Sequence, residues 1–177
     1  MAGRKTSEGR RGLPTTITLA ALKRTWHVTY AHDPARAELR EEDGTLAVTS
    51  PKNLDVPLAL LRQWLRERAR RELPGIVDAE ARRCGIVPGR LQFRIQKSRW
   101  GSRSATGTLS LNAALLFLDL DLVRHVIVHE LCHVRHRNHS TAFKVLLARN
   151  DPKWMIHEAR LRQAAGEVPS WVWPQRD

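Results

Sequence analysis

Residues 126–139 read Val-Ile-Val-His-Glu-Leu-Cys-His-Val-Arg-His-Arg-Asn-His, and this stretch decides the fold. His129 and His133 are four positions apart, so on an α-helix they lie one turn apart and about 40° around the axis, and both imidazoles can reach one metal ion. Glu130 is offset from this pair and can stand beside the metal, where it can take a proton from bound water. The spacing predicts a metal site with its own general base.

His139 would complete a set of three imidazoles if the chain turns back after the motif helix. Six positions after His133, a continuing helix would carry His139 to the opposite side of the axis. We expect a turn at Arg137-Asn138, because Asn tolerates the left-handed conformation that ends helices, and a new helix capped by Ser140 or Thr141. Three His ligands leave one tetrahedral position for water, which is typical of catalytic zinc.

The alternative is that the motif arose by chance in a chain with eight His residues. Its context argues against this, because residues 122–134 form an apolar run that is typical of a buried helix. Two His and one Glu in such a helix would carry a desolvation cost unless their polar atoms were satisfied. The context therefore favours the metal site.

Further segments on both sides of the motif make the chain recognisable. Arg99-Trp100-Gly101-Ser102 and residues 108–112 precede the motif, and Asn138-His139-Ser140 and Phe143 follow it. Together with the motif helix, these segments closely resemble the YgjP-like metal-dependent hydrolase family. The resemblance covers most of the chain, and its motifs are specific from about Phe93 to Phe143.

This resemblance implies a compact α+β, zincin-like metallopeptidase domain, in which His129, His133 and His139 bind one Zn²⁺ and Glu130 is the catalytic base. We expect an N-terminal antiparallel sheet or hairpin, a small mixed sheet, and the active-site helix followed by C-terminal helices. Arg103 stands where family members commonly carry Cys, and it adds a cation near the site.

Other His and Glu residues remain alternatives around the site. The spacing at His133, His136 and His139 is also similar to that of the Wss1-like and SprT-like proteases, which act on DNA–protein crosslinks. Glu158 would be the third ligand if the site were of the gluzincin type, but His139 is favoured because it needs only one turn to reach the metal. We interpret His125 and His136 as packed residues or as hydrogen-bond partners of a ligand.

Length and composition favour a single domain. With 177 residues and 42% hydrophobic content, the chain is long enough for one core. We expect residues 1–12 to form a disordered basic tail and residues 13–177 to form the domain. Within it, residues 13–56 would form a β part and residues 57–177 a helical, zinc-binding part.

A cytoplasmic location is expected, without a membrane partner. The N-terminus lacks the apolar core of a secretory signal, and no apolar run approaches the roughly 18 residues of a membrane span. Cys84 and Cys132 are the only cysteines, so we expect no disulfide framework and interpret both as buried thiols.

The net charge of +12 raises the question of a nucleic-acid partner. A basic surface attracts phosphate backbones without sequence specificity. The basic residues are mostly Arg and are spread along the chain, as a GC-rich genome would produce without selection for binding. Nonspecific binding of nucleic acid therefore remains open.

The periodicity of the chain places the motif within a set of strands and helices. Strands are expected at residues 16–19, 25–30, 37–40 and 45–48, and an amphipathic helix is expected from Pro57 with a break or kink at Pro74-Gly75. Residues 91–95 and 108–111 should form two paired strands, joined by a loop at 97–107 that borders the metal site. Helices should follow at 140–149 and 150–165, and the C-terminal tryptophans should fold back onto the body.

The leading hypothesis is a zinc metallopeptidase that acts on a protein or peptide. In zincins an edge strand pairs with extended substrate, and the resemblance assigns this role to residues 108–111 or to the neighbouring strand. Arg99 and Arg103 are candidates to stabilise an oxyanion or to bind substrate phosphate or carboxylate, and the alternative for them is a solvated basic loop.

Two other functions remain alternatives. Lys97, together with the two arginines, motivates a nucleoside triphosphate pyrophosphatase. The net charge motivates a DNA-binding module or one associated with DNA–protein crosslinks.

Overall fold

The computed structural model describes residues 8–9 and 12–173. The strands are β1 (Glu8–Gly9), β2 (Leu13–Pro14), β3 (Thr16–Leu19), β4 (Arg24–His32), β5 (Glu38–Glu42), β6 (Thr45–Ser50), β7 (Leu91–Arg94), β8 (Gly101–Arg103) and β9 (Leu109–Asn112). The α-helices are α1 (Asp55–Cys84), α2 (Leu120–Cys132), α3 (Thr141–Asn150) and α4 (Trp154–Leu161). This mixture of sheets and helices confirms the predicted α+β class.

The predicted basic tail at residues 1–12 falls largely outside the described residues. Within it, only residues 8–9 and 12 are described, and β1 pairs with β2. Among the described residues, no helix combines the length and the apolar character needed to cross a membrane.

The N-terminal sheet contains four strands in the order β3-β4-β6-β5, close to the predicted positions. Asp43 and Gly44 form the tight turn between β5 and β6, with positive φ angles of 44° and 76°. The predicted antiparallel arrangement is wrong for one pair, because β4 and β6 are parallel. In the β5–β6 hairpin, β6 takes the position next to β4 because it buries Leu46 and Val48. The charged strand β5 suits the edge of the sheet.

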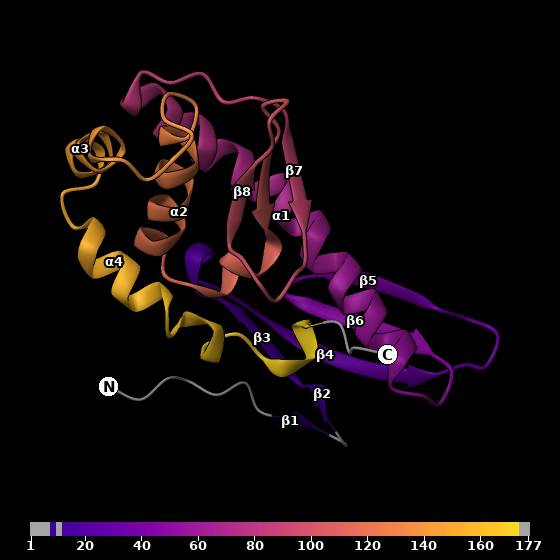
Figure 1. Ribbon diagram of the computed structural model, residues 1–177. Helices are drawn as coiled ribbons and strands as arrows, with labels where there is room; N and C mark the ends of the chain where they lie inside the picture. Colours follow the sequence, from indigo (N-terminus) through magenta and orange to yellow (C-terminus); the bar gives the residue numbers. More distant parts are fainter. Residues whose placement is uncertain (1–7, 10–11, 174–177) are drawn as a thin grey trace.

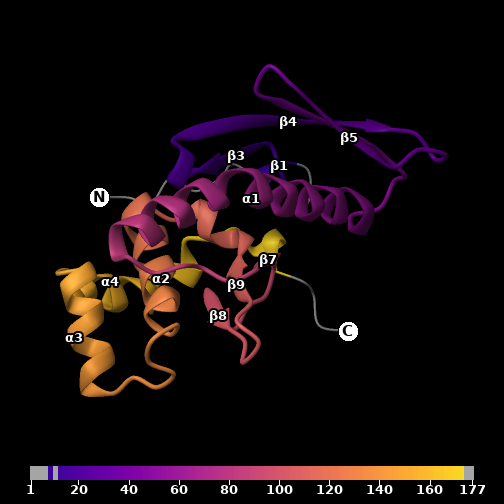
Figure 2. The ribbon, with the colours of Figure 1, turned by 90° about the horizontal axis from the view of Figure 1, so that it is seen from above.

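Helix α1 lies between the N-terminal sheet and the remainder of the protein, as Figure 2 shows. It runs through Pro74 without interruption, so the break considered at Pro74-Gly75 is not observed. Leu73 and Val77 are fully buried on either side of the proline, and their packing holds the helix continuous. The helix ends at Gly85, as predicted, in the left-handed conformation with φ 62°.

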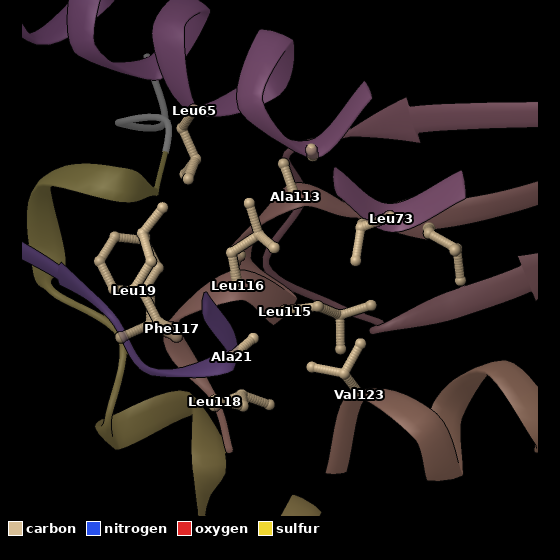
Figure 3. Close-up of a cluster of buried hydrophobic side chains, with 14 of the residues drawn as sticks. Leu19, Ala21, Leu65, Leu73, Ala113, Leu115, Leu116, Phe117, Leu118 and Val123 are labelled. Atoms are coloured by element: carbon tan, nitrogen blue, oxygen red, sulfur yellow. The ribbon is translucent and has the colours of Figure 1, made fainter. Parts of the chain in front are cut away.

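The hydrophobic core joins α1 to α2 through a short buried segment. The 3-10 helix η3 (Ala113–Phe117) is buried along its whole length. In Figure 3 its side chains lie between Leu65 and Leu73 of α1 and Val123 of α2, with Leu19 beside them. The core therefore fixes α2, which carries the His-Glu motif, against α1.

The second sheet has the strand order β7-β9-β8. β7 and β9 are paired, as predicted, and they run parallel to each other. The expected connecting loop contains a further strand, β8, which pairs antiparallel with β9. The strand at residues 108–111 lies in the centre of the sheet and therefore has no free edge for a substrate. Its neighbour β8 is the edge strand that lies beside α2 (Figure 1).

The C-terminal segment packs against the end of η3, where the ring of Trp171 lies edge-on to that of Phe117 at a centroid distance of 6.1 Å. After α4 the chain forms short 3-10 helices at Ala164–Gly166 and Ser170–Val172. Trp171 is buried, and the ring of Trp173 packs edge-on against that of Trp100 at a centroid distance of 6.3 Å. The tryptophans therefore fold back as predicted. Cys132 is buried and Cys84 is half-buried, and both are free thiols.

A polar cluster around Glu41 ties the N-terminal sheet to α1. Its carboxylate accepts hydrogen bonds from Trp26 Nε1 at 2.8 Å and from Trp64 Nε1 at 2.9 Å, and it also pairs with Arg68. The Arg68 side chain is only 9% exposed, so removing its partner would leave a buried cation without this carboxylate.

We predict that Glu41→Ala lowers the free energy of unfolding by about 2 kcal/mol, because it leaves two indole N–H groups without their acceptor and the buried guanidinium with Glu72 as its remaining carboxylate partner. Urea denaturation measures this loss, and Glu42→Ala, at an exposed position on the same strand, is the matched control with little expected effect. Equal effects of the two substitutions would contradict the assigned role.

The same cluster predicts a pH dependence. Burial acts to raise the pKa of Glu41, but hydrogen bonds from Trp64, Trp26 and Arg68 lower it below its usual 4.5. A lowered pKa in the folded state means that the contribution to stability is fully present above pH 4.5 and is lost as the pH falls through the folded-state pKa. The difference in stability between the wild type and Glu41→Ala should therefore narrow in acid.

Candidate active site

The motif lies on α2, which is a buried helix as predicted. Val126, Ile127, Val128 and Leu131 are almost completely buried in it. Figure 1 shows α2 between the small sheet on one side and α3 and α4 on the other. The helix ends at Cys132, so His133 is its C-terminal cap.

The structure brings His129, His133 and His139 together. One nitrogen from each ring lies within 4.8 Å of the others, and His129 Nε2 and His139 Nε2 are 3.0 Å apart. All three rings pack against Phe143, with centroid distances of 5.0, 4.7 and 4.8 Å. The Phe143 ring therefore contacts all three imidazoles and helps to fix their positions.

The chain turns back between the motif helix and His139, as expected, but Asn138 does not adopt the expected left-handed conformation, since Lys23 and Asp43 are the described non-glycine residues with positive φ. After His133 the chain leaves the helix, and α3 begins at Thr141 with Ser140 as its N-cap. The Ser140 hydroxyl accepts a hydrogen bond from the Phe143 backbone N–H at 3.4 Å. This cap fixes the start of α3, and with it the positions of both His139 and Phe143.

The protonation of the imidazoles suits a metal ion. Burial lowers the pKa of His129 to about 3, and the nearby His133 and His139 add to the shift, so this ring is neutral. His133 Nδ1 lies 3.0 Å from the carbonyl oxygen of His136, to which it must donate, so Nε2 remains available as a ligand atom. These three side chains therefore fit a zinc-type ion, with donors that zinc prefers.

Glu130 is buried beside the imidazoles, with a relative exposure of 7%. Burial raises the pKa of Glu130 to about 7, and the positive charge of Arg99 opposes this shift. A carboxylate with a pKa in this range is suited to accept and release a proton near neutrality.

Gly101 on β8 makes room for the Glu130 side chain. A Cβ atom at position 101 would lie 2.8 Å from Glu130 Cγ and 2.9 Å from Glu130 Oε1, closer than packed atoms allow. Any side chain here would displace the carboxylate. In the sequence Gly101 is recognisable only as part of the Arg99–Ser102 motif, and its contact with Glu130 follows from the fold.

Asn112 holds the loop that leads into β8. Its side-chain Nδ2 donates to the carbonyl oxygens of Gln96 at 2.6 Å and Arg99 at 3.0 Å, and its Oδ1 accepts from Ala114 N–H at 3.0 Å. Asn112 is 1% exposed, so these bonds are shielded from water. It therefore positions Arg99 and the start of β8, a role that only the three-dimensional structure reveals.

Two hollows meet at the motif helix and share Gly101, His129 and Glu130 in their linings. One has a volume of about 510 Å³ and is basic, with Arg99, Arg103 and Arg137 in its lining. The other has a volume of about 340 Å³ and is more apolar. Its lining includes Trp100, Val126, Leu161 and Glu158.

The two arginines predicted to bind substrate both line the basic hollow. Arg99 is exposed, whereas Arg103 is half-buried with its Nη1 3.5 Å from the His133 carbonyl oxygen, at the C-terminal end of α2. A cation there also interacts favourably with the helix dipole. Lys97 is exposed and does not line this hollow.

The alternative ligand Glu158 lies on the other side of the motif. It groups with His125 and His129, whereas His139 groups with both motif histidines. The arrangement therefore favours His139 over Glu158 as the third ligand at this site. His125 is buried, its Nδ1 lies 2.6 Å from Asp151 Oδ2, and its ring packs edge-on against that of His129 at a centroid distance of 6.2 Å.

Comparison with known proteins points to the same chemistry. A family model described as YgjP-like, metallopeptidase domain, matches residues 5–164. A comparison with curated proteins finds no match.

Solved structures similar to the chain include two metallopeptidase zymogens. Abylysin of Pyrococcus abyssi is 22% identical with a TM-score of 0.47, and the match covers 51% of this chain and 91% of the other. Jannalysin of Methanocaldococcus jannaschii is 23% identical with a TM-score of 0.47, and the match covers 52% of this chain and 95% of the other.

We predict that Gly101→Ala lowers hydrolytic activity by about tenfold or more, because the added methyl group displaces Glu130 from its position. Metal content and thermal stability should change little, since the imidazoles are untouched. Gly166→Ala, where the added atom would meet open space, is the control. Full activity in the Gly101 variant would show that Glu130 needs no such fixed position.

Proposed function

We propose that this chain, which belongs to the YgjP-like metallopeptidase family, is a zinc-dependent hydrolase of peptide bonds. In this proposal His129, His133 and His139 hold one zinc ion and Glu130 is the general base. The observation that carries the proposal is the convergence of three imidazole nitrogens within 4.8 Å, next to a buried carboxylate. Zinc in such a site would polarise a carbonyl group and lower the pKa of bound water, so that the nucleophilic hydroxide forms near neutral pH.

The residues of the chain supply the proton transfer and the positioning. Glu130 takes the proton from the attacking water and passes it to the departing amine, for which its raised pKa is suited. Gly101 keeps the carboxylate in place, and Phe143 supports the imidazoles. Arg99 and Arg103 line the basic hollow, where a cation would stabilise negative charge on the substrate.

The substrate in this proposal is an extended peptide that lies along β8. This strand pairs with β9 on one side and is the last strand of its sheet within the described residues, so its other edge can pair with a peptide backbone. The two hollows on either side of Glu130 would receive substrate side chains. Their linings favour an apolar side chain next to Trp100 and an acidic one next to Arg99.

We predict that Glu130→Gln lowers peptide hydrolysis by about 100-fold or more while zinc remains bound, because the amide cannot accept the proton. Cleavage of a mixed peptide library, followed by mass spectrometry, measures activity and reads out side-chain preference. Glu167→Gln, at an exposed carboxylate that lines neither hollow, is the control and should keep full activity. A Glu130→Gln protein with bound zinc and unchanged cleavage would refute the assigned role.

The third ligand has its own test. We predict that His139→Ala weakens zinc binding by at least about tenfold, because one of three protein–metal bonds is lost, whereas Glu158→Ala leaves the affinity unchanged. Titration of the metal-free proteins with zinc against a chelating indicator measures both affinities. The opposite pattern would identify Glu158 as the ligand.

A second candidate function is hydrolysis of nucleoside triphosphates to release pyrophosphate. It is favoured by one observation, the three arginines of the basic hollow, which would suit a phosphate chain. Within the described residues, each possible metal cluster contains at most one carboxylate, unlike the sites that hold magnesium and phosphates. Release of pyrophosphate that disappears in Glu130→Gln would favour this function over the peptidase.

A further inference from the structure

A second cluster of metal-type ligands lies about two helical turns along α2 from His133. It consists of His125 on α2, Asp151 at the end of α3, and His157 on α4. Asp151 Oδ2 lies 2.6 Å from His125 Nδ1 and 2.8 Å from His157 Nδ1. The other carboxylate oxygen, Oδ1, accepts a hydrogen bond from the Lys153 backbone N–H at 3.1 Å.

His125 and Asp151 of the cluster are buried, and His157 is half-buried. His125 is 2% exposed and Asp151 is 9% exposed. No Lys or Arg in the described part of the chain forms an ion pair with Asp151, so its two closest partners are imidazoles. Hydrogen bonds from the two imidazoles and from the Lys153 backbone N–H compensate the buried carboxylate, and a cation between the three side chains would add a full positive charge beside it.

We propose that His125, Asp151 and His157 bind a second metal ion of the zinc type, separate from the one at His129. Two imidazole nitrogens and a carboxylate oxygen are ligands that zinc accepts. Bonds of roughly 2.0–2.1 Å in a tetrahedral site place ligand atoms about 3.3 Å apart, so the rings would move outward by about half an ångström when the ion binds. Metal binding at Nδ1 requires each neutral ring to carry its proton on Nε2, so the two Nδ1–H hydrogen bonds to Asp151 are given up.

Space for the ion and its remaining ligand adjoins the cluster. A cavity of about 360 Å³ is lined by the three side chains and by Glu80 and Asp121, among others. Arg83 and Arg124 also line it and pair with these two carboxylates. Water from this cavity can fill the fourth position of a zinc ion.

A metal ion at this cluster would link α2, the end of α3 and α4. None of the residues of α4 is buried, and Met155 and Ile156 on it are 66% and 60% exposed. α4 contacts the body through the half-buried Trp154 and Leu161 and through two polar contacts, that of His157 with Asp151 and the ion pair of Arg160 with Asp119 at 2.6 Å. Because α4 supplies Glu158 and Leu161 to the apolar hollow, a metal that links α2 to α4 would fix one wall of the proposed substrate site.

Metal content measured by elemental mass spectrometry, after zinc loading and gel filtration, tests this inference. We expect about two zinc ions per chain in the wild type and about one in His157→Ala. Asp151→Asn, which keeps the shape of the side chain, is a second variant with the same expectation. His27→Ala removes an exposed imidazole on β4 and should keep both ions.

Hydrogen exchange supplies a readout that does not depend on activity. Zinc should slow exchange of the α4 amides in the wild type and in His133→Ala, but not in His157→Ala. One zinc per chain that is lost in His133→Ala and retained in His157→Ala would overturn the second site and leave the proposed function intact. One zinc that is lost in His157→Ala and retained in His133→Ala would support the second site and contradict the proposed function.

Discussion

The structure depends on the burial of polar side chains in an apolar helix. α2 packs against α1, η3 and the small sheet, yet it carries His125 and Glu130 almost completely buried and His129 partly so. Each of these groups loses its hydration on folding, and this loss costs free energy unless neighbouring groups compensate it. Asp151 serves His125, the converging imidazoles of His133 and His139 surround His129, and Gly101 leaves space for Glu130.

Local patterns in the sequence predicted the parts of this arrangement that depend on neighbours in the chain. The four-residue spacing of His129 and His133 predicted a helix with both rings on one side. The polar segment after it predicted a turn and a new helix capped by Ser140 or Thr141, and Ser140 is the N-cap of α3. Alternation of apolar residues located β7 and β9, and the Asp43-Gly44 pair located a hairpin. In each case hydrogen bonding or sterics within a few residues determine the conformation.

Features that depend on distant residues could not be predicted in the same way. The place of β6 between β4 and β5 follows from competition between strands for the buried position, and β8 forms only because β9 offers it an edge. α1 continues through Pro74 because packing on both sides outweighs the local preference. His125 and Asp151 are far apart in the sequence, and no spacing rule connects them; the one available signal was the place of His125 one turn before His129.

In the proposed function, three imidazoles and no carboxylate hold the zinc ion. Anomalous scattering from crystals of the zinc-loaded protein, recorded on both sides of the zinc absorption edge, locates the ion directly. We expect a peak bounded by His129, His133 and His139, with Glu130 nearby but outside bonding distance. A peak at His129 that is bonded to Glu158 and remote from His139 would contradict it.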